Sequence, residues 1–243
     1  MRLFCQRSTV NSQQSMVNVC LILLESLIRL YIGRHYAHSS QQKNLLSVVC
    51  CPLTFLTFVK NISMKILVTY AFDEEVLPFE IQNVEITFLR TGMGKVLSAF
   101  NLTKALCEDK YDLVLNVGTA GTLNHKVGEI FVCHRFIDRD LEKIVLPHVC
   151  SDISFPEKIG IDFIDNYEKV GVSNTGDSFV TEVGHFTGDV IDMEAFAQAQ
   201  VCKSMNVNFV AVKYITDIIG QNSREVWLDK LRDSREALKE FFA

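Results

Sequence analysis

From Met64 onward the chain alternates short apolar runs with segments of helical spacing. Seven runs rich in β-branched and aromatic residues predict strands: Lys65–Tyr70, Val84–Leu89, Leu113–Val117, Ile130–Phe136, Val170–Val172, Val190–Ile191 and Asn208–Ile215. Residues 95–107 carry a loose helical face. A clearer amphipathic helix closes the chain, with apolar residues at spacings close to 3.6: Trp227, Leu231, Leu238 and Phe241. Near-continuous apolar strands alternating with helices predict an α/β fold whose sheet is mainly parallel and covered on both faces.

Glycines cluster directly after three of the predicted strands, at 91–95, 118–121 and 174–177. None of the three matches a phosphate loop or a dinucleotide-binding fingerprint. Taken singly, each is typical of a tight turn between a strand and a helix. Ligands bind beyond the carboxyl ends of strands in such sheets, so together these clusters predict a rim where backbone approaches a small ligand closely.

Acidic residues occupy the same kind of junction. The run Asp73-Glu74-Glu75 follows the first strand, and Glu194 and Asp217 follow two later ones. Helix N-termini and caps often carry such acids, and we favour that interpretation for Asp73 and Glu74. Three carboxylates at one edge of a buried sheet are seldom there without a task. Their convergence therefore favours a carboxylate-lined active site.

Charge and cysteine content narrow the class of protein. Residues 64–243 hold 18 Lys and Arg against 28 Asp and Glu, and an acidic body argues against a nucleic-acid groove, which needs a basic stripe. The eight cysteines show no C-x-x-C spacing, and several lie in apolar runs, as reduced and buried thiols do. The histidines show no metal-binding spacing, and His134 is interpreted as structural. We expect a reducing, cytoplasmic compartment.

Residues 1–63 have a different composition, with six Lys and Arg against one acid and two apolar patches. The patch at 17–32 is interrupted by charges and the patch at 44–59 has 16 residues, whereas a membrane helix needs roughly 20. Neither is followed by a clear signal-peptide cleavage site. We expect this stretch to be a poorly structured or non-native extension, with Met64 as the natural start of a 64–243 domain. A membrane-associated leader and a docked extension are the alternatives.

Six stretches of the body occur together in an order that resembles one family. They are MKILVTYAFDEEV (64–76), RTGMGKV (90–96), LNVGTAGTLNHKVGEIFV (115–132), SNTGDSFV (173–180), VIDMEAFAQAQVC (190–202) and VAVKYITDI (210–218). This set resembles the purine nucleoside phosphorylase/uridine phosphorylase superfamily and, within it, the 5′-methylthioadenosine/S-adenosylhomocysteine nucleosidases. The resemblance implies a three-layer α/β/α sandwich with a central, mainly parallel mixed sheet. It also implies hydrolysis of the N-glycosidic bond of an adenine thionucleoside in purine and methionine salvage, by a homodimer that uses neither a cofactor nor a metal.

The chemistry of that reaction explains the acids. Breaking the bond passes through an oxocarbenium-like ribose cation, so adenine must leave as a neutral base and water must arrive opposite it. The resemblance assigns the proton donor near purine N7 to Asp217, which a buried neighbourhood keeps protonated, and the base for water to Glu75. It assigns substrate binding to six further residues: Glu194 (ribose hydroxyls), Met193 (sugar), Phe179 (stacking on adenine), Val180 (adenine edge, through its backbone), and Thr91 and Lys213 (the water).

The chain also departs from the family pattern. Lys213 stands where arginine is expected and Thr91 where serine is usual. The stretch between Asp140 and Ser173, which in the family helps close the pocket for the 5′-substituent, is short. No basic cluster surrounds Arg90 near the first glycine turn, which favours water over phosphate. A phosphate-dependent phosphorylase, a futalosine hydrolase of the same fold and a non-catalytic nucleoside-binding module are the alternatives.

Overall fold

A computed structural model of the chain describes residues 64–144, 146–184, 187–221 and 223–243, which belong to one compact unit. Its strands are β1 Met64–Tyr70, β2 Val84–Arg90, β3 Leu113–Thr122, β4 Ile130–Asp138, β5 Asp152–Ser154, β6 Val170–Thr175, β7 Val190–Asp192 and β8 Asn208–Ile218. Its helices are α3 Lys95–Glu108, α4 Asp162–Asp165, α5 Ala195–Met205 and α6 Ser223–Phe241. The expectations for residues 1–63 lie outside the described residues.

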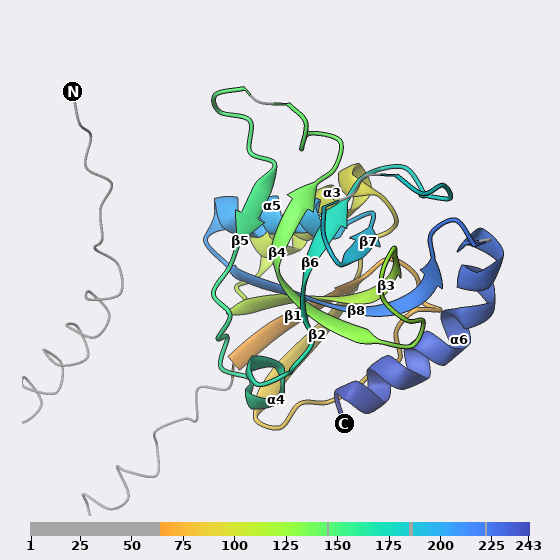
Figure 1. The fold of residues 1–243 in the computed structure, drawn as a ribbon. Coiled ribbons are helices and arrows are strands. Elements are labelled where there is room, and N and C mark those ends of the chain that lie inside the picture. The colour runs from red at the N-terminus through yellow and green to blue at the C-terminus, as the bar shows by residue number, and fades with distance from the viewer. Residues whose placement is uncertain (1–63, 145, 185–186, 222) are drawn as a thin grey trace, which may run out of the picture. The chain divides into compact units, whose positions relative to one another are not determined.

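The strands form one mixed sheet in which parallel pairs predominate. Strand order runs β2-β1-β3-β7-β6-β4-β5, and β8 pairs with both β3 and β4. The pairs β1–β2, β1–β3, β3–β8, β4–β6 and β6–β7 are parallel, and β3–β7, β4–β5 and β4–β8 are antiparallel. Because β8 pairs with both β3 and β4, while β7 and β6 connect β3 to β4 by the other route, these five strands form a closed ring of paired neighbours (Figure 1).

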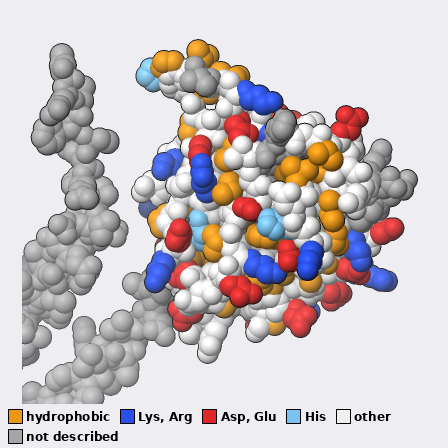
Figure 2. Space-filling model, viewed as in Figure 1, with side chains coloured by type: hydrophobic (Ala, Val, Ile, Leu, Met, Phe, Trp, Pro, Cys, Tyr) orange, Lys and Arg blue, Asp and Glu red, His pale blue; other side chains and the backbone are white. Residues whose placement is uncertain are grey.

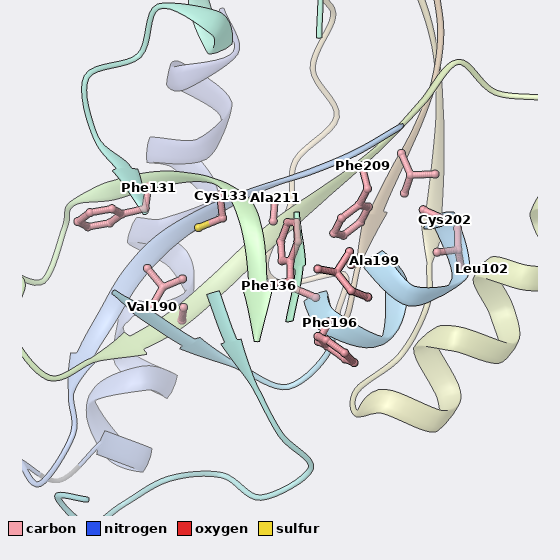
Figure 3. Close-up of a cluster of buried hydrophobic side chains, with 14 of the residues drawn as sticks. Leu102, Phe131, Cys133, Phe136, Val190, Phe196, Ala199, Cys202, Phe209 and Ala211 are labelled. Carbon is pink, nitrogen blue, oxygen red and sulfur yellow. The ribbon is translucent and has the colours of Figure 1, made fainter. Parts of the chain in front are cut away.

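Helices cover both faces of the sheet, as the alternation of side chains along each strand requires. Leu67 of β1 packs in a buried cluster with α3 and α5, whereas its neighbours Ile66 and Val68 pack in a second cluster with α4 and α6. Figure 3 shows the first cluster, in which the rings of Phe136 and Phe209 lie 4.8 Å apart. The predicted three-layer α/β/α sandwich is confirmed.

Each predicted strand is present, and most extend a few residues further than the apolar run that predicted them. The short elements β5 and α4 were not predicted, because three or four residues carry too little periodicity. Two interpretations were wrong. Asp73 and Glu74 lie in a turn rather than at a helix N-terminus, and Gly118–Gly121 lies inside β3 rather than in a turn after it.

The structure shows how charged side chains, cysteines and apolar helices are distributed over the described residues. On the face shown in Figure 2, the Lys and Arg side chains of the described residues are interspersed with Asp and Glu rather than gathered into a stripe. Cys133 and Cys202 are buried thiols, as predicted, but Cys107 and Cys150 are exposed. Among the helices of the described residues, none combines the length and apolarity needed to cross a bilayer.

Candidate active site

A cavity of about 410 Å³ lies beside the last residues of β3, β7 and β8, a size that suits a small-molecule ligand. Six of the eight predicted site residues line it: Glu75, Phe179, Val180, Met193, Glu194 and Asp217. The three carboxylates come from the loop after β1, the β7–α5 junction and β8, so only the folded sheet brings them together. Thr91 and Lys213 are buried and do not line the cavity.

Glu75 is held by four hydrogen bonds. Its Oε2 accepts from the backbone N–H groups of Ala71 and Phe72, each at 3.3 Å. Its Oε1 accepts from the backbone N–H of Thr119 at 3.2 Å and from the Thr119 hydroxyl at 2.5 Å. A Cβ added to Gly118 would lie 3.5 Å from both Glu75 oxygens, an ordinary contact distance, so the carboxylate lies directly against this glycine. Glu75 is therefore a buried acceptor with a fixed orientation at the cavity wall.

Asp217 faces the cavity because of a β-bulge. Gly121 of β3 pairs with Asp217 and Ala120 pairs with Ile215, so Thr216 is the extra residue on β8. A bulge of this kind re-aims the following side chain. The Asp217 carboxylate packs against Gly121, where an added Cβ would lie only 3.1 Å from Oδ2, and its Oδ1 accepts from the Thr216 hydroxyl at 2.9 Å. Asp217 is only 3% exposed, so the carboxyl lies in a desolvated position.

Glu194 connects the β7–α5 junction, where it lies, to the glycine turn between β2 and α3. It is the N-cap residue of α5, and its Oε1 accepts a 2.8 Å hydrogen bond from the backbone N–H of Gly94. Gly94 has φ +89°, a conformation that favours glycine, and it ends the turn between β2 and α3. Burial raises the pKa of Glu194 to about 7; Lys213 and the Gly94 N–H oppose the rise, and Asp192 and Glu75 add to it.

An ion pair joins Asp192, which lines the cavity, to Lys213, which does not. Lys213 Nζ is 2.8 Å from Asp192 Oδ2, and both side chains are almost fully buried. Asp192 Oδ1 accepts from the Thr175 hydroxyl at 2.5 Å, so both of its oxygens are occupied. Burial acts to lower the pKa of Lys213, but Asp192, Glu194 and Glu75 together raise it, so the ammonium stays charged. Lys213 therefore affects the site in two ways: it pairs with Asp192, and its positive charge favours the ionised form of Glu194.

Arg139, at the end of β4, organises the loop that carries Phe179 and Val180. Its Nη1 donates to the carbonyl oxygens of Asn174 and Asp192, at 3.1 and 3.0 Å, and its Nη2 donates to those of Gly176 and Ser178. A Cβ added to Gly176 would lie 2.5 Å from Arg139 Nε, so the guanidinium occupies the space that this glycine leaves. Burial lowers the pKa of Arg139 from its ordinary value.

The cavity wall also includes residues that are absent from the predicted site, among them Thr119, Arg139, Asp192 and Trp227. The Thr119 hydroxyl donates to Glu75, whereas the Thr91 hydroxyl donates to the Tyr70 carbonyl at 3.1 Å. The signal for Thr119 was its place at the end of an apolar strand, two residues after Val117. Trp227 is one of the apolar residues whose spacing predicts the last helix, and that spacing carries no signal of a place in a site.

Among the residues that the structure describes, no group of three or more His, Cys, Asp and Glu side chains is arranged to hold a metal ion.

The family model described as "Phosphorylase superfamily" matches residues 72–156 and 165–243, and this chain belongs to that superfamily. A relative from Bacillus subtilis named 5′-methylthioadenosine/S-adenosylhomocysteine nucleosidase is 31% identical over 168 residues, which is 59% of this chain and 73% of the relative.

Solved structures share the fold at lower identity. A Helicobacter pylori 5′-methylthioadenosine nucleosidase, an aspartate-to-asparagine mutant with 5′-methylthioadenosine in its active site, superimposes with a TM-score of 0.63 at 21% identity. The superposition covers 73% of this chain and 96% of that one. The futalosine hydrolase of Helicobacter pylori superimposes with a TM-score of 0.64 at 21% identity, covering 74% and 95% of the two chains. The phosphorylase-like fold is therefore established.

The raised pKa of Glu194 predicts how stability depends on pH. The folded value of about 7 lies above the ordinary 4.5, so the protonated group contributes stability that is complete below pH 4.5 and lost as pH rises through 7. Glu194→Gln keeps an acceptor for the Gly94 N–H but cannot titrate. Between pH 4.5 and 7.5, we expect the free energy of unfolding of the wild type to fall relative to this variant by up to about 3 kcal/mol.

Urea denaturation at four pH values across this range measures the difference. The matched control is Glu236→Gln, the same change at an exposed position on α6. Parallel curves for the wild type and Glu194→Gln would contradict the expectation.

Proposed function

We propose that this protein hydrolyses the N-glycosidic bond of adenine thionucleosides such as 5′-methylthioadenosine and S-adenosylhomocysteine, releasing adenine. One observation carries the proposal: a single cavity is lined by Glu75, Glu194 and Asp217 and by the half-exposed ring of Phe179. The nucleosidase name of the Bacillus subtilis relative supports it. Hydrolysis of this bond needs a proton donor for the leaving adenine, a water on the opposite side of the ribose and groups that bind the sugar, and the cavity offers side chains suited to each.

Asp217 is the general acid of this proposal. An adenine anion is a poor leaving group, so protonation at N7 lowers the barrier to bond cleavage. The desolvated position of Asp217 against Gly121 and β8 suits a carboxyl group that donates a proton to a bound base. The ring of Phe179 stacks on the adenine, and the Val180 backbone binds its edge.

Glu75 is the group that orients and activates the water. Its four hydrogen bonds fix the carboxylate, so a water held by the carboxylate arrives in a defined direction at the ribose carbon. Glu194 accepts from the ribose hydroxyls and Met193 packs against the sugar. Lys213 supports this arrangement through its ion pair with Asp192, and Thr91 does so through its hydrogen bond to the Tyr70 carbonyl, next to the segment that carries Glu75.

Water is favoured over phosphate as the acceptor of the ribosyl group. Arg139 is the basic side chain among the described residues that line the cavity, and its guanidinium already donates to four backbone carbonyls. Arg90 Nη1 pairs with Asp73 Oδ2 at 2.9 Å on the surface. The engagement of Arg139 with backbone and the surface pairing of Arg90 with Asp73 both favour water over phosphate.

The working unit of the proposal is a cytoplasmic homodimer that serves purine and methionine salvage. Apolar side chains stand exposed along one side of α3 and the turn before it: Met93, Val96, Leu97 and Phe100. Met93 also lines the cavity, so a second copy seated on this side would lie next to the substrate. The four described cysteines are free thiols, which supports a reducing compartment.

The first experiment incubates the full chain with 5′-methylthioadenosine, S-adenosylhomocysteine, adenosine, inosine and futalosine, with and without phosphate. Release of free base is followed by chromatography. We expect phosphate-independent adenine from the two thionucleosides. Asp217→Asn should lower kcat at least about 10²-fold with little change in ligand affinity, because the amide cannot protonate N7.

The outcomes separate the alternatives. Strict phosphate dependence would assign a phosphorylase, and selective cleavage of futalosine would assign a futalosine hydrolase. Binding without turnover by a folded wild type would indicate a non-catalytic module. Unchanged turnover in Asp217→Asn would remove the proposed role of that residue.

The two glycines of β3 give a second, matched prediction. Gly121→Ala places a Cβ 3.1 Å from Asp217 Oδ2, closer than ordinary contact, whereas Gly118→Ala places one 3.5 Å from Glu75. A displacement of a few tenths of an ångström is enough to disturb proton transfer, so we expect Gly121→Ala to lower kcat about 10-fold and more than Gly118→Ala does. Steady-state kinetics of both variants test this, and equal effects would contradict it.

The dimer has its own test. Phe100 is 66% exposed on α3, and Phe100→Glu puts a charge in the centre of the apolar side. We expect analytical ultracentrifugation to show a dimer for the wild type and a monomer for Phe100→Glu, because an unpaired charge is costly to bury. Leu228→Glu, at an exposed position on α6, is the control that should stay dimeric. A monomeric wild type would overturn this part of the proposal.

A further inference from the structure

Trp227 is the single tryptophan of the chain, and α6 places it at the cavity. Its ring lies 6.1 Å from that of Phe72 and 6.0 Å from that of Phe179, measured between centroids. The indole thus stands between the segment that follows β1 and the loop proposed to hold adenine. Packing alone explains an aromatic residue there. It does not explain why the residue presents an N–H group to the site.

The indole N–H has a specific partner. Trp227 Nε1 donates to Thr119 Oγ1 at 3.0 Å, and Thr119 Oγ1 lies 2.5 Å from Glu75 Oε1. An indole nitrogen is a donor and never an acceptor, and an ionised carboxylate is an acceptor only. The Thr119 hydroxyl therefore accepts from Trp227 and directs its one hydrogen to Glu75. The direction of the chain Trp227–Thr119–Glu75 is fixed by the chemistry of its two ends.

This relay acts on the one movable donor of Glu75. The other three hydrogen bonds of Glu75 come from backbone N–H groups, which the fold holds in place. The Thr119 hydroxyl, by contrast, rotates about its C–O bond. A second partner that can only donate leaves the hydroxyl a single satisfactory orientation, and hydrogen bonds in series strengthen one another.

We propose that Trp227 is a positioning residue that orients Glu75 through the hydroxyl of Thr119. The inference rests on the proposed function, in which Glu75 activates the attacking water. Phenylalanine at this position would keep an aromatic ring in the packing but remove the donor. Because the indole also lies beside Phe179, a base that enters next to that ring meets the residue that orients the catalytic carboxylate.

A double-mutant cycle tests the proposal with Trp227→Phe, Thr119→Val and the double variant in the full chain. Steady-state hydrolysis of 5′-methylthioadenosine gives kcat and KM. We expect Trp227→Phe to lower kcat about 10-fold and Thr119→Val about 100-fold, each with KM changed by less than about 3-fold. The double variant should be no slower than Thr119→Val, because Trp227 acts through the hydroxyl that this variant lacks.

Fluorescence provides a readout that does not depend on turnover. Thr119→Val removes the acceptor of the indole N–H, so the emission of Trp227 should shift to shorter wavelength. Thr119→Ser keeps the hydroxyl and should retain both the wild-type emission and most of kcat. Thr103→Val, the same change at an exposed position on α3, is the matched control and should alter neither. Adenine titrations, followed by calorimetry for Trp227→Phe, show that binding is retained.

The results separate the role of Trp227 from the proposed hydrolytic function. A folded wild type that releases no base would remove the proposed function and the role of Trp227 with it. An active wild type in which the two substitutions lower kcat independently, or in which Trp227→Phe leaves kcat unchanged, would overturn the relay alone. If Trp227→Phe does not fold, unchanged emission in Thr119→Val or loss of activity in Thr119→Ser would overturn it.

Discussion

The parallel pairing of β3 with β8 is the constraint on which the site depends. Its register sets Gly118 opposite Lys213 and Gly121 opposite Asp217, and the bulge at Thr216 re-aims the second of these pairs. Thr119, between the two glycines, holds Glu75. A shift of one residue between these strands would turn every side chain to the opposite face of the sheet. The placement of Asp217 at the cavity, the bond from Thr119 to Glu75 and the packing of both carboxylates against the glycines would be lost together.

Electrostatics explains why this part of the molecule needs a buried cation. Asp192, Glu194 and Glu75 are withdrawn from water in one neighbourhood, and Lys213 is the positive charge set among them. Burial raises the pKa of Glu194, and the Lys213 ammonium, which pairs with Asp192, opposes that rise without cancelling it. Lysine presents a compact charge where arginine would present a planar fork. The single Lys213–Asp192 contact suits that difference, because Thr175 satisfies the other Asp192 oxygen.

Much of the fold and part of the site were predictable from local pattern. Strands such as β1 and β3 are runs of apolar residues that can be buried on both faces, and their alternation with helices leaves few topologies. Glu75, Glu194 and Asp217 stood out because they are acids at strand ends. Thr119 and Trp227 did not, because a threonine in a strand and a tryptophan in an amphipathic helix are ordinary there. The relation between them spans 108 residues, and no local signal encodes it.

The sequence by itself determined the class of fold, the order of its elements and the kinds of side chain available for chemistry. Hydrophobic periodicity and residue type are properties of short stretches of chain, so they can be read without knowing what lies nearby. The tertiary structure alone decided that the hydroxyl of Thr119 rather than that of Thr91 donates to Glu75, that Lys213 pairs with Asp192 and does not line the cavity, and that Arg139 holds the loop of Phe179. These relations depend on strand register, a bulge and the closed ring of paired strands, which are fixed only when distant segments pack together.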